Sequence, residues 1–214
     1  MTPAPLLVID GDSLGHRAYH AMPPVPDDQG RPSGLLLGVA NVLVSTYDLV
    51  RPRTVLVALD SRVPSYRHEL LPGYQGQRPP FPADLTEQLD ALPLLAEAFG
   101  FVAAKVPPFE ADDLLASGVE RELAGGGTAV VMTSDRDAYQ LVSDRSRVLV
   151  PSKAGKPPEQ VDEAGVVERY GVRAAQVPEL IALRGDPSDA IPGAKGIGAV
   201  SAADLLRRYE RSRA

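Results

Sequence analysis

Short runs of hydrophobic residues alternate along the chain with longer segments in which hydrophobic residues recur at helical spacing. Continuous hydrophobic runs are typical of strands that are buried on both faces of a mainly parallel sheet. They occupy residues 6–9, 55–59, 101–106 and 129–133, and a fifth run at 147–150 is interpreted as an edge strand. Strands and helices that alternate in this way indicate an α/β fold, with a mainly parallel central sheet flanked by helices.

Helical spacing predicts helices both between the strands and after them. Ser33 is a candidate N-cap for a helix that runs from Gly34 to about Val50. Gly100 and Gly125 lie where the C-caps of two later helices are expected. The other predicted helices span residues 83–99, 110–123, 162–170, 177–183 and 200–209.

The segment at 61–82 differs from its surroundings, because it holds five prolines and two glycines and lacks hydrophobic periodicity. A connection of this length in a compact domain is typically functional or mobile. No strand is expected after about Val161. We therefore expect an α/β core at 1–160, which includes the 61–82 segment, and a helical part at 161–214 that packs on the core.

Acidic residues gather where the predicted strands end. Three strands are followed by an aspartate, namely Asp10, Asp60 and Asp135. In open α/β sheets ligands bind beyond the carboxyl ends of the strands, so these carboxylates converge if their strands are parallel neighbours. Further acids open a predicted helix, follow the fourth strand or lie in a glycine-rich turn. They are Glu110, Asp112, Asp113, Asp137, Asp186 and Asp189.

Each of these nine acids has an ordinary structural explanation, as a turn residue or as an acid in the first turn of a helix. Together they are harder to explain, because like charges about 4 Å apart repel by about 4 kcal/mol at an effective dielectric constant of about 20. Such a cluster requires protons or bound cations, and oxygen ligands favour Mg²⁺ or Mn²⁺ over zinc. Two such ions support in-line displacement at phosphorus, so the acids predict a metal-dependent phosphoryl-transfer enzyme, most simply a hydrolase.

Composition narrows the class of protein further. The 214 residues include no cysteine, which excludes disulfides, thiolate zinc sites, iron–sulfur clusters and thiol catalysis. No hydrophobic run approaches the roughly 18–20 residues of a membrane helix, and no charged segment precedes the first run as in a signal peptide. We expect a soluble cytoplasmic protein with no membrane partner. The net charge of −6 argues against nucleic acid, but without the nine acids the chain is mildly basic, which permits a polyanionic substrate.

A glycine-rich turn separates the last two predicted helices. Gly193, Gly196 and Gly198 allow close approach of a ligand, and the amides that open the following helix form a natural phosphate site. Lys195 and several arginines nearby add positive charge. The segment is similar to a helix–hairpin–helix element, which contacts the DNA backbone and does not read its sequence. An ordinary helical hairpin is the alternative.

Five sequence blocks, in this order along the chain, resemble the 5′-nuclease superfamily. They are VIDGDSLGHRAYHA (8–21), ALDSRVPSYRHELLPGYQGQRPP (58–80), FEADDLLA (109–116), TSDRDAYQLV (133–142) and LRGDPSDAIPGAKGIG (183–198). Within that superfamily the chain is most similar to the 5′→3′ exonucleases of the bacterial DNA polymerase I type and to flap endonucleases. The resemblance implies a PIN-like fold, phosphodiester hydrolysis near the 5′ end or junction of branched DNA by two metal ions, and work in DNA replication and repair.

The resemblance also implies roles for individual residues. Ligands of a first metal would be Asp10, Asp60, Glu110 and Asp112, and those of a second Asp135, Asp137 and Asp189, with Asp112 near both. Asp113 and Asp186 match family acids that act through water or at a more distant ion. The 61–82 segment matches the arch over the 5′ end. The implied DNA contacts are His16, Arg17, Arg67, Tyr74, Gln75, Arg78, Lys195, Gly196 and Gly198, of which Arg78 contacts the region of the scissile phosphate and is counted with the catalytic residues.

Cofactors and partners follow from the same resemblance. Two or more Mg²⁺ or Mn²⁺ ions are expected at the acids, and K⁺ is a further candidate at the carbonyls of the glycine-rich turn. The expected partners are DNA with a 5′ flap, overhang or nick, and RNA primer–DNA hybrids. We expect a monomer of bacterial type that is associated with the nucleoid.

Four positions depart from the family pattern, namely His16, Gln75, Ala190 and Val200. His16 replaces a tyrosine that stacks on a base, and Gln75 replaces the arch lysine, a cation expected to stabilise the transition state or to position the phosphate. Because the acids remain while substrate contacts differ, we expect an active metal site with altered structure preference. The chain stops soon after the glycine-rich turn, where relatives continue, which indicates a truncated chain or a short form without a polymerase module.

Two other functions are considered. A DNA-structure-binding protein of the same fold with weak or lost catalysis is suggested by the missing cation at Gln75, although an unused acid cluster would lower stability. A small-molecule phosphohydrolase would use Asp10 as a covalent nucleophile within the motif that contains Asp12. That reading leaves the glycine-rich turn unexplained, and we interpret Asp12 as a loop residue.

Overall fold

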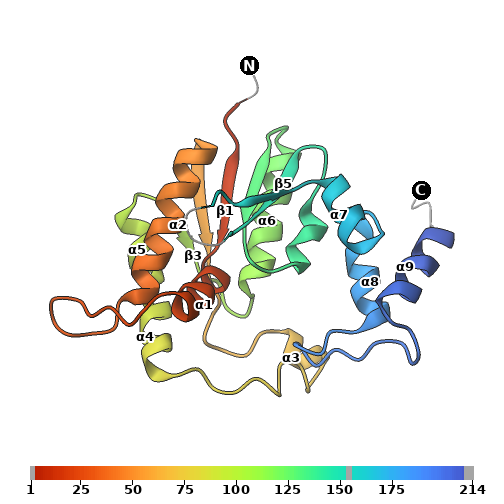
Figure 1. Cartoon of the computed structure of the whole chain (residues 1–214), viewed down its shortest axis with the longest axis horizontal. Coiled ribbons are helices and arrows are strands. Elements are labelled where there is room, and N and C mark those ends of the chain that lie inside the picture. Colours follow the sequence, from red (N-terminus) through yellow and green to blue (C-terminus); the bar gives the residue numbers. More distant parts are fainter. Residues whose placement is uncertain (1–2, 153–155, 210–214) are drawn as a thin grey trace.

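The computed structural model describes residues 3–152 and 156–209, and within them a six-stranded sheet runs through the middle of the molecule (Figure 1). The strand order is β3-β2-β1-β4-β5-β6, and all neighbours are parallel except β5 and β6, which are antiparallel. The strands are β1 (Leu6–Asp10), β2 (Thr54–Ala58), β3 (Val102–Ala104), β4 (Ala129–Met132), β5 (Ser146–Val150) and β6 (Glu159–Val161).

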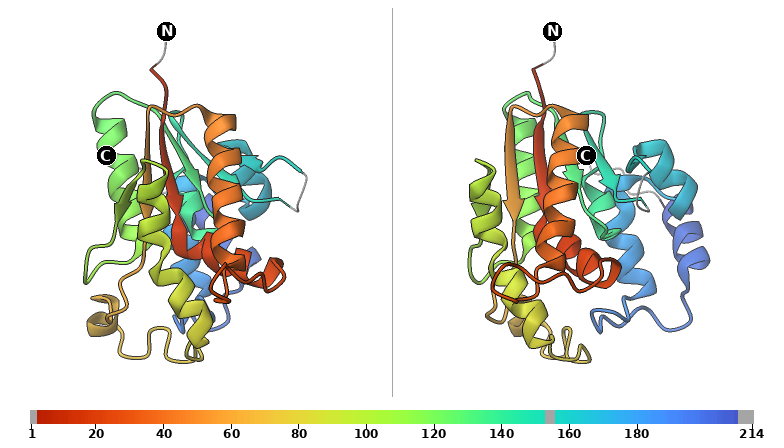
Figure 2. Two further views of the ribbon diagram at one scale, coloured as in Figure 1. Left: turned by 90° about the vertical axis from the view of Figure 1, so that its left-hand side faces the viewer. Right: turned by 60° about the vertical axis from the view of Figure 1, so that its left-hand side comes forward.

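Helices cover both faces of this sheet, so the fold has three layers (Figure 2). One face is packed by α1 (Gly11–Ala21), α2 (Gly34–Val50), α4 (Ala83–Asp90) and α5 (Leu92–Ala98). The other is packed by α6 (Ala111–Ala124), the 3₁₀ helices η1 (Asp137–Leu141) and η2 (Ala174–Gln176), α7 (Glu163–Tyr170) and the start of α8 (Val177–Arg184). The remaining helices are α3 (Arg67–Leu70) and α9 (Ala199–Arg208).

Side-chain alternation along β1 explains why its hydrophobic run is continuous. Leu7 and Ile9 pack into the core on the face of α1 and α2, whereas Leu6 and Val8 pack into the core on the face of α6. A strand that is buried on both faces has no solvent side, so it carries no polar alternation. The predicted α/β fold with a mainly parallel sheet is confirmed.

Two predictions about the elements were wrong. The run at 147–150 is not an edge strand, because β5 pairs with β4 on one side and with β6 on the other. The short strand β6 was not predicted, because it has only three residues and two of them are polar and exposed. The single helix predicted at 83–99 is broken at Ala91 into α4 and α5, because Pro93 in the first turn of α5 cannot donate a backbone hydrogen bond.

Helix α1 was not predicted, and it places Asp12 in a helix and not in a loop. The Asp10 carboxylate accepts a hydrogen bond from the Ser13 N–H at 3.0 Å, which makes Asp10 the N-cap of α1. Asp12 therefore lies in the first turn of a helix, where it is only 4% exposed. Our interpretation of Asp12 as a loop residue was wrong.

Near the C-terminus, α8 and α9 form a small core of their own. Val172, Leu180, Ala202 and Ala203 are buried there, and residues 185–198 connect the two helices. The start of α8 also belongs to the core beneath the sheet, through Val177. This arrangement attaches the helical C-terminal residues to the α/β layers. No helix in the described ranges is long and apolar enough to cross a membrane.

Candidate active site

The strand order places three acids at one end of the sheet. Strands β2, β1 and β4 are adjacent and parallel, so the segments that follow them leave from the same edge. Asp10 ends β1, and Asp60 and Asp135 follow β2 and β4 by two and three residues. The convergence that the sequence suggested rests on this adjacency.

Asp10 is the most enclosed of these acids, with an exposed fraction of 4%. Besides its bond to Ser13, its carboxylate accepts a hydrogen bond of 2.6 Å from the Thr133 hydroxyl at the end of β4. Burial, opposed by these hydrogen bonds and assisted by the charge of Asp60, raises the pKa of Asp10 to about 7. A bound cation would therefore stabilise the ionised form of this buried carboxylate. No pattern in the sequence indicates the supporting role of Thr133.

Asp12 connects the ends of β1 and β2. Its Oδ2 accepts a hydrogen bond of 2.7 Å from the Asp60 N–H, and the Asp60 Oδ1 in turn accepts one of 2.7 Å from the Ala111 N–H at the start of α6. Arg62 lies 2.9 Å from Asp12 and also pairs with Asp90 at 3.1 Å. These contacts fix the orientation of the Asp60 carboxylate. The Asp-Gly-Asp spacing was the available signal for Asp12.

The first turn of α6 contributes three acids with different surroundings. Asp113 forms a capping box with Glu110 and accepts hydrogen bonds of 2.8 and 2.9 Å from the Arg67 guanidinium. Burial favours the neutral acid, but the Arg67 contacts outweigh it and hold the pKa of Asp113 below its usual value. Asp112 has no such partner in the part of the chain that the structure describes. The surrounding protein, together with Asp10 and Asp135, raises the pKa of Asp112 to about 8, although this side chain is open to solvent.

The acids after β4 and before α9 form the second half of the cluster. The Asp135 Oδ1 accepts a hydrogen bond of 2.8 Å from the Asp137 N–H. Desolvation and the charges of Asp135 and Asp186 raise the pKa of Asp137 to about 6. Asp186 is engaged locally, since its Oδ1 accepts hydrogen bonds of 2.8 and 2.7 Å from the Ser188 N–H and hydroxyl.

The 61–82 segment reaches into the acid cluster. Tyr74, which is 5% exposed, places its hydroxyl 3.0 Å from the Glu110 Oε2 and 3.2 Å from the Asp189 Oδ2. Arg78 forms an ion pair with Asp189, and Arg67 lies 3.4 Å from Glu110. Burial and the two carboxylates raise the pKa of Tyr74, which remains a neutral hydrogen-bond donor.

The contacts of the 61–82 segment occupy two of the carboxylates that could bind a metal ion. In the described ranges no three acidic or histidine side chains are already arranged to hold a metal ion. The chemistry of the donors nevertheless fits a hard divalent cation, because they are carboxylates that raise one another's pKa. Glu110 and Asp189 are occupied by the arginines and the tyrosine of the 61–82 segment. Both would have to exchange their arginine for a cation, whereas Tyr74 bonds only one oxygen of each carboxylate.

The remaining candidates lie around the acids. The His16 ring packs edge-on against Phe81 with centroids 4.6 Å apart, and Arg17 donates a hydrogen bond of 3.0 Å to the Ser152 carbonyl. Lys195, Gly196 and Gly198 lie exposed on the connection before α9, where Gly198 is the N-cap. Gly196 has φ +81, a conformation that favours glycine.

A groove of about 530 Å³ opens beside the cluster, between α3, α6, η1 and α8. The acids Asp112, Asp137 and Asp189 line it together with Arg67 and Tyr74. Its other wall is apolar. Acids from several strand ends, arginines from a long connection and an adjoining groove thus lie together at this end of the sheet.

Residues 5–171 match the family described as "5'-3' exonuclease, N-terminal resolvase-like domain". The chain belongs to this 5′-3′ exonuclease family. The DNA polymerase I of Deinococcus radiodurans is 39% identical over 210 residues, and that of Thermus thermophilus 37% identical over 204 residues. These alignments cover 97% and 95% of this chain but only 21% and 24% of the relatives. The chain thus spans about a quarter or less of the length of the DNA polymerases that it matches.

Solved structures agree with the 5′-3′ exonuclease family in fold. The bacteriophage T5 D15 protein, co-crystallised with metal ions, has a TM-score of 0.79 at 22% identity and covers 95% of this chain and 75% of its own. The catalytic core of Rad2 in complex with DNA substrate has a TM-score of 0.57 at 18% identity and covers 98% of this chain and 63% of its own. At these identities the likeness establishes the fold alone.

Proposed function

We propose that this chain hydrolyses phosphodiester bonds near the 5′ end or junction of branched DNA, as a divalent-metal-dependent 5′→3′ exonuclease and flap endonuclease. The observation that carries the proposal is the convergence of Asp10, Asp60 and Asp135 with Asp112 at the carboxyl ends of adjacent strands. Membership of the 5′-3′ exonuclease family supports the same conclusion.

The proposed metal ligands form two groups. Asp10, Asp60, Glu110 and Asp112 would hold one ion, and Asp135, Asp137 and Asp189 the other, with Asp186 farther out. Asp113 is committed to Arg67 and to the cap of α6, so we now assign it to holding the arch and not to a metal. When bound, two Mg²⁺ or Mn²⁺ ions activate a water and stabilise charge on the attacking and leaving oxygens.

The chain's own residues then bind and orient the substrate. We propose that the 61–82 segment is the arch and that Arg67 and Arg78 exchange carboxylate partners for phosphate oxygens when DNA enters. Duplex would be held at the connection before α9, where Lys195 and the amides that open α9 face solvent, as in a helix–hairpin–helix element. The backbone carbonyls of this connection are candidate ligands for a K⁺ ion. Residues 1–160 and 161–214 would divide the work into cleavage and duplex binding.

DNA is the proposed partner for a further reason. The bacteriophage T5 flap endonuclease was solved with DNA and metal ions, and human GEN1 with Holliday junction DNA. We extend DNA binding to this chain, with a 5′ flap, overhang or nick as the preferred structure and RNA primer–DNA hybrids as a further substrate. The protein would act as a monomer.

Cleavage of a 5′-labelled flap DNA with Mn²⁺ or Mg²⁺ tests this function. Wild-type protein should release product at the flap junction, and Asp135→Asn should lose cleavage while still binding DNA. Asp28→Asn, which changes an exposed aspartate outside the cluster, is the matched control and should cleave normally. Cleavage by Asp135→Asn at the wild-type rate would refute the assignment of the metal ligands.

A DNA-structure-binding protein with weak or lost catalysis is the second candidate. It is favoured by Gln75, which supplies no positive charge beside Glu110 and Asp189. Titration of Mn²⁺ or Ca²⁺ into the protein, followed by thermal unfolding, separates the two functions. A raised melting temperature supports the nuclease, because ions that bind only the folded state stabilise it. Unchanged melting with retained DNA binding supports the second candidate.

A further inference from the structure

The 61–82 segment and the connection before α9 meet in a joint formed by residues 74–78 and 188–190. The Gln75 N–H donates a hydrogen bond of 3.0 Å to the Asp189 carbonyl, and Arg78 pairs with the Asp189 side chain. Gln75 and Ala190, which belong to this joint, have backbone φ angles of +53 and +57. Residues other than glycine rarely adopt such angles. Such conformations persist where surrounding contacts impose them, and they concentrate at functional sites.

The Gln75 side chain continues the joint into the acid cluster. Its Nε2 donates a hydrogen bond of 3.0 Å to the Tyr74 hydroxyl oxygen. Tyr74 has one proton to offer, and that proton lies within reach of both the Glu110 and the Asp189 carboxylates. Because Gln75 fills an acceptor site of the phenol, the proton must point away from Gln75, towards the carboxylates.

We propose that Gln75 is a positioning residue, which acts through Tyr74 to hold Glu110 and Asp189 at the spacing that two neighbouring cation sites require. This inference rests on the proposed function and names one residue more for the same site. It replaces the expectation that Gln75 contacts DNA. Residues that hydrogen-bond metal ligands, as Tyr74 would, typically change metal affinity by about 10–100-fold when they are lost, so for Gln75 we expect the lower end of this range.

The neutrality of Gln75 is part of this role. A cation beside Glu110 and Asp189 would compete with a metal ion for the same carboxylates. The amide instead supplies an N–H donor without charge, and Arg78, which is 46% exposed, remains the cation that can leave Asp189. The arrangement keeps both carboxylates aligned and adds no third cation to Arg67 and Arg78, which must leave them when a metal ion binds.

Calorimetric titration of Mn²⁺ into the whole chain tests the proposal without relying on cleavage. Gln75→Met keeps the length of the side chain and removes its donor, and we expect Mn²⁺ affinity to fall about 10-fold. Gln75→Gly accepts the positive φ freely, lacks the donor and should show the same loss. Gln77→Met, at an exposed residue of the same segment, is the matched control and should match wild type.

A double-mutant cycle and steady-state cleavage sharpen the result. If Gln75 acts through Tyr74, adding Gln75→Met to Tyr74→Phe should weaken Mn²⁺ binding no further. In flap cleavage Gln75→Met should lower kcat and leave the KM for DNA within about 2-fold. Unchanged Mn²⁺ affinity, or a raised KM with wild-type kcat, would overturn the role of Gln75 while wild-type activity stands. A wild-type protein that binds no Mn²⁺ and cuts no DNA would refute the proposed function as well.

Discussion

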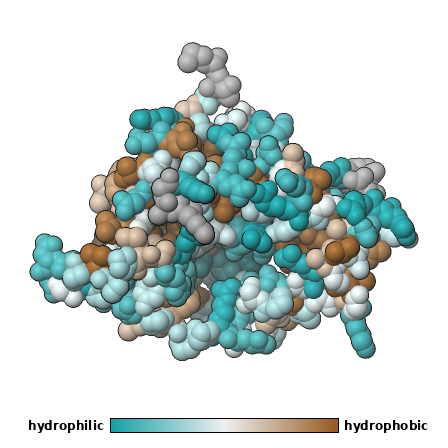
Figure 3. Space-filling view, viewed as in Figure 1, coloured by the Kyte–Doolittle hydropathy of each residue, from teal (hydrophilic) through white to brown (hydrophobic). Residues whose placement is uncertain are grey.

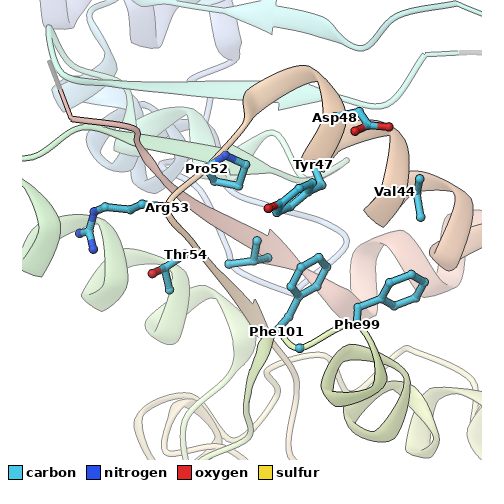
Figure 4. Close-up of a pocket in the computed structure, with 10 residues that line it drawn as sticks. Val44, Tyr47, Asp48, Pro52, Arg53, Thr54, Phe99 and Phe101 are labelled. Atoms are coloured by element: carbon cyan, nitrogen blue, oxygen red, sulfur yellow. The ribbon is translucent and has the colours of Figure 1, made fainter. Parts of the chain in front are cut away.

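The two ends of the sheet are built on opposite principles. At the carboxyl end, acids from β1, β2 and β4 lie together, and the pKa values of Asp10 and Asp112 rise to about 7 and 8. At the amino end, the rings of Tyr47, Phe101 and Phe99 stack beside a hollow of about 440 Å³ (Figure 4). Successive ring centroids there are 5.8 Å apart.

Charged side chains form ion pairs at the amino end of the sheet but not throughout the carboxyl end. At the amino end each charged side chain that lines the hollow has a partner, since Asp48 pairs with Arg51 and Arg53 pairs with Glu122. At the carboxyl end Asp10 and Asp112 form no ion pair among the described residues, and the nearby charge of Arg67 does not offset the rise in the pKa of Asp112. A protein accepts such unbalanced charge where function requires it. The comparison therefore locates the active end without reference to relatives.

Exposed hydrophobic side chains lie at both ends of the sheet, and Leu70 and Phe109, beyond the carboxyl ends of β2 and β3, are 77% and 44% exposed. Figure 3 shows brown side chains over α2, where Leu37, Val44 and Leu49 are 44–55% exposed. The residues of the acid cluster are hydrophilic. The two ends thus differ in the pairing of their charges, and mutations can change one end at a time.

Asp10→Asn should have the largest effect. It removes a proposed metal ligand, so flap cleavage should fall by about 10³-fold, which is the upper range for loss of one group that stabilises transition-state charge. The metal-free variant should nevertheless resist urea better than wild type near pH 7, because the buried charge is gone. Asp144→Asn, an exposed change at the amino end, should alter neither property.

The pH dependence of wild-type stability has a defined sign. The pKa of Asp10 is higher in the folded protein than in the unfolded chain, so its contribution is complete below about pH 4 and is lost as pH rises through about 7. In EDTA the free energy of unfolding should therefore fall over this range, by at most about 1.4 kcal/mol per pH unit for one such group. Asp10→Asn should flatten this slope, and an unchanged slope would contradict the assignment.

Asp12→Ala should have an intermediate effect. The change leaves the Asp60 N–H without its acceptor and Arg62 without its inner partner, so we expect kcat to fall by about 10–100-fold. Asp12→Asn keeps an acceptor and should restore much of the loss. Asp90 is 48% exposed and pairs with Arg62 and Lys105, so Asp90→Asn removes only outer contacts and should change kcat little. Equal losses in Asp12→Ala and Asp90→Asn would show that the placement of Arg62 matters and the hydrogen bond from the Asp60 N–H to Asp12 does not.

Phe101→Ala should have the smallest effect on catalysis and the clearest effect on the amino end. It removes the central ring of the stack, and for this half-buried side chain we expect a loss of about 2 kcal/mol in unfolding free energy. Flap cleavage below the melting temperature should stay at the wild-type rate. Phe99→Ala, which truncates an outer ring that is 39% exposed, should cost less. A large loss of cleavage in either variant would show that the two ends are coupled.

Much of the fold could be predicted, because it depends on local patterns. The buried strands β1, β2 and β4 have continuous hydrophobic runs, and α2 occupies Gly34–Val50 as its spacing predicts. The elements that were missed, such as α1 and β6, are short or polar. Helix α1 begins at an aspartate that looked like an isolated strand-end acid, and its N-cap role depends on a hydrogen bond that periodicity does not report.

The chain by itself determined that acids follow strands and that no cysteine thiolate competes with their oxygens. Only the tertiary structure decided which acids share an environment. Asp113 was indistinguishable from Asp112 along the sequence, yet it is bound by Arg67, which lies 46 residues away. Tyr74 meets Asp189 across 115 residues. Sequence patterns report local periodicity, whereas such contacts depend on the order of the strands and on the paths of the long connections between them.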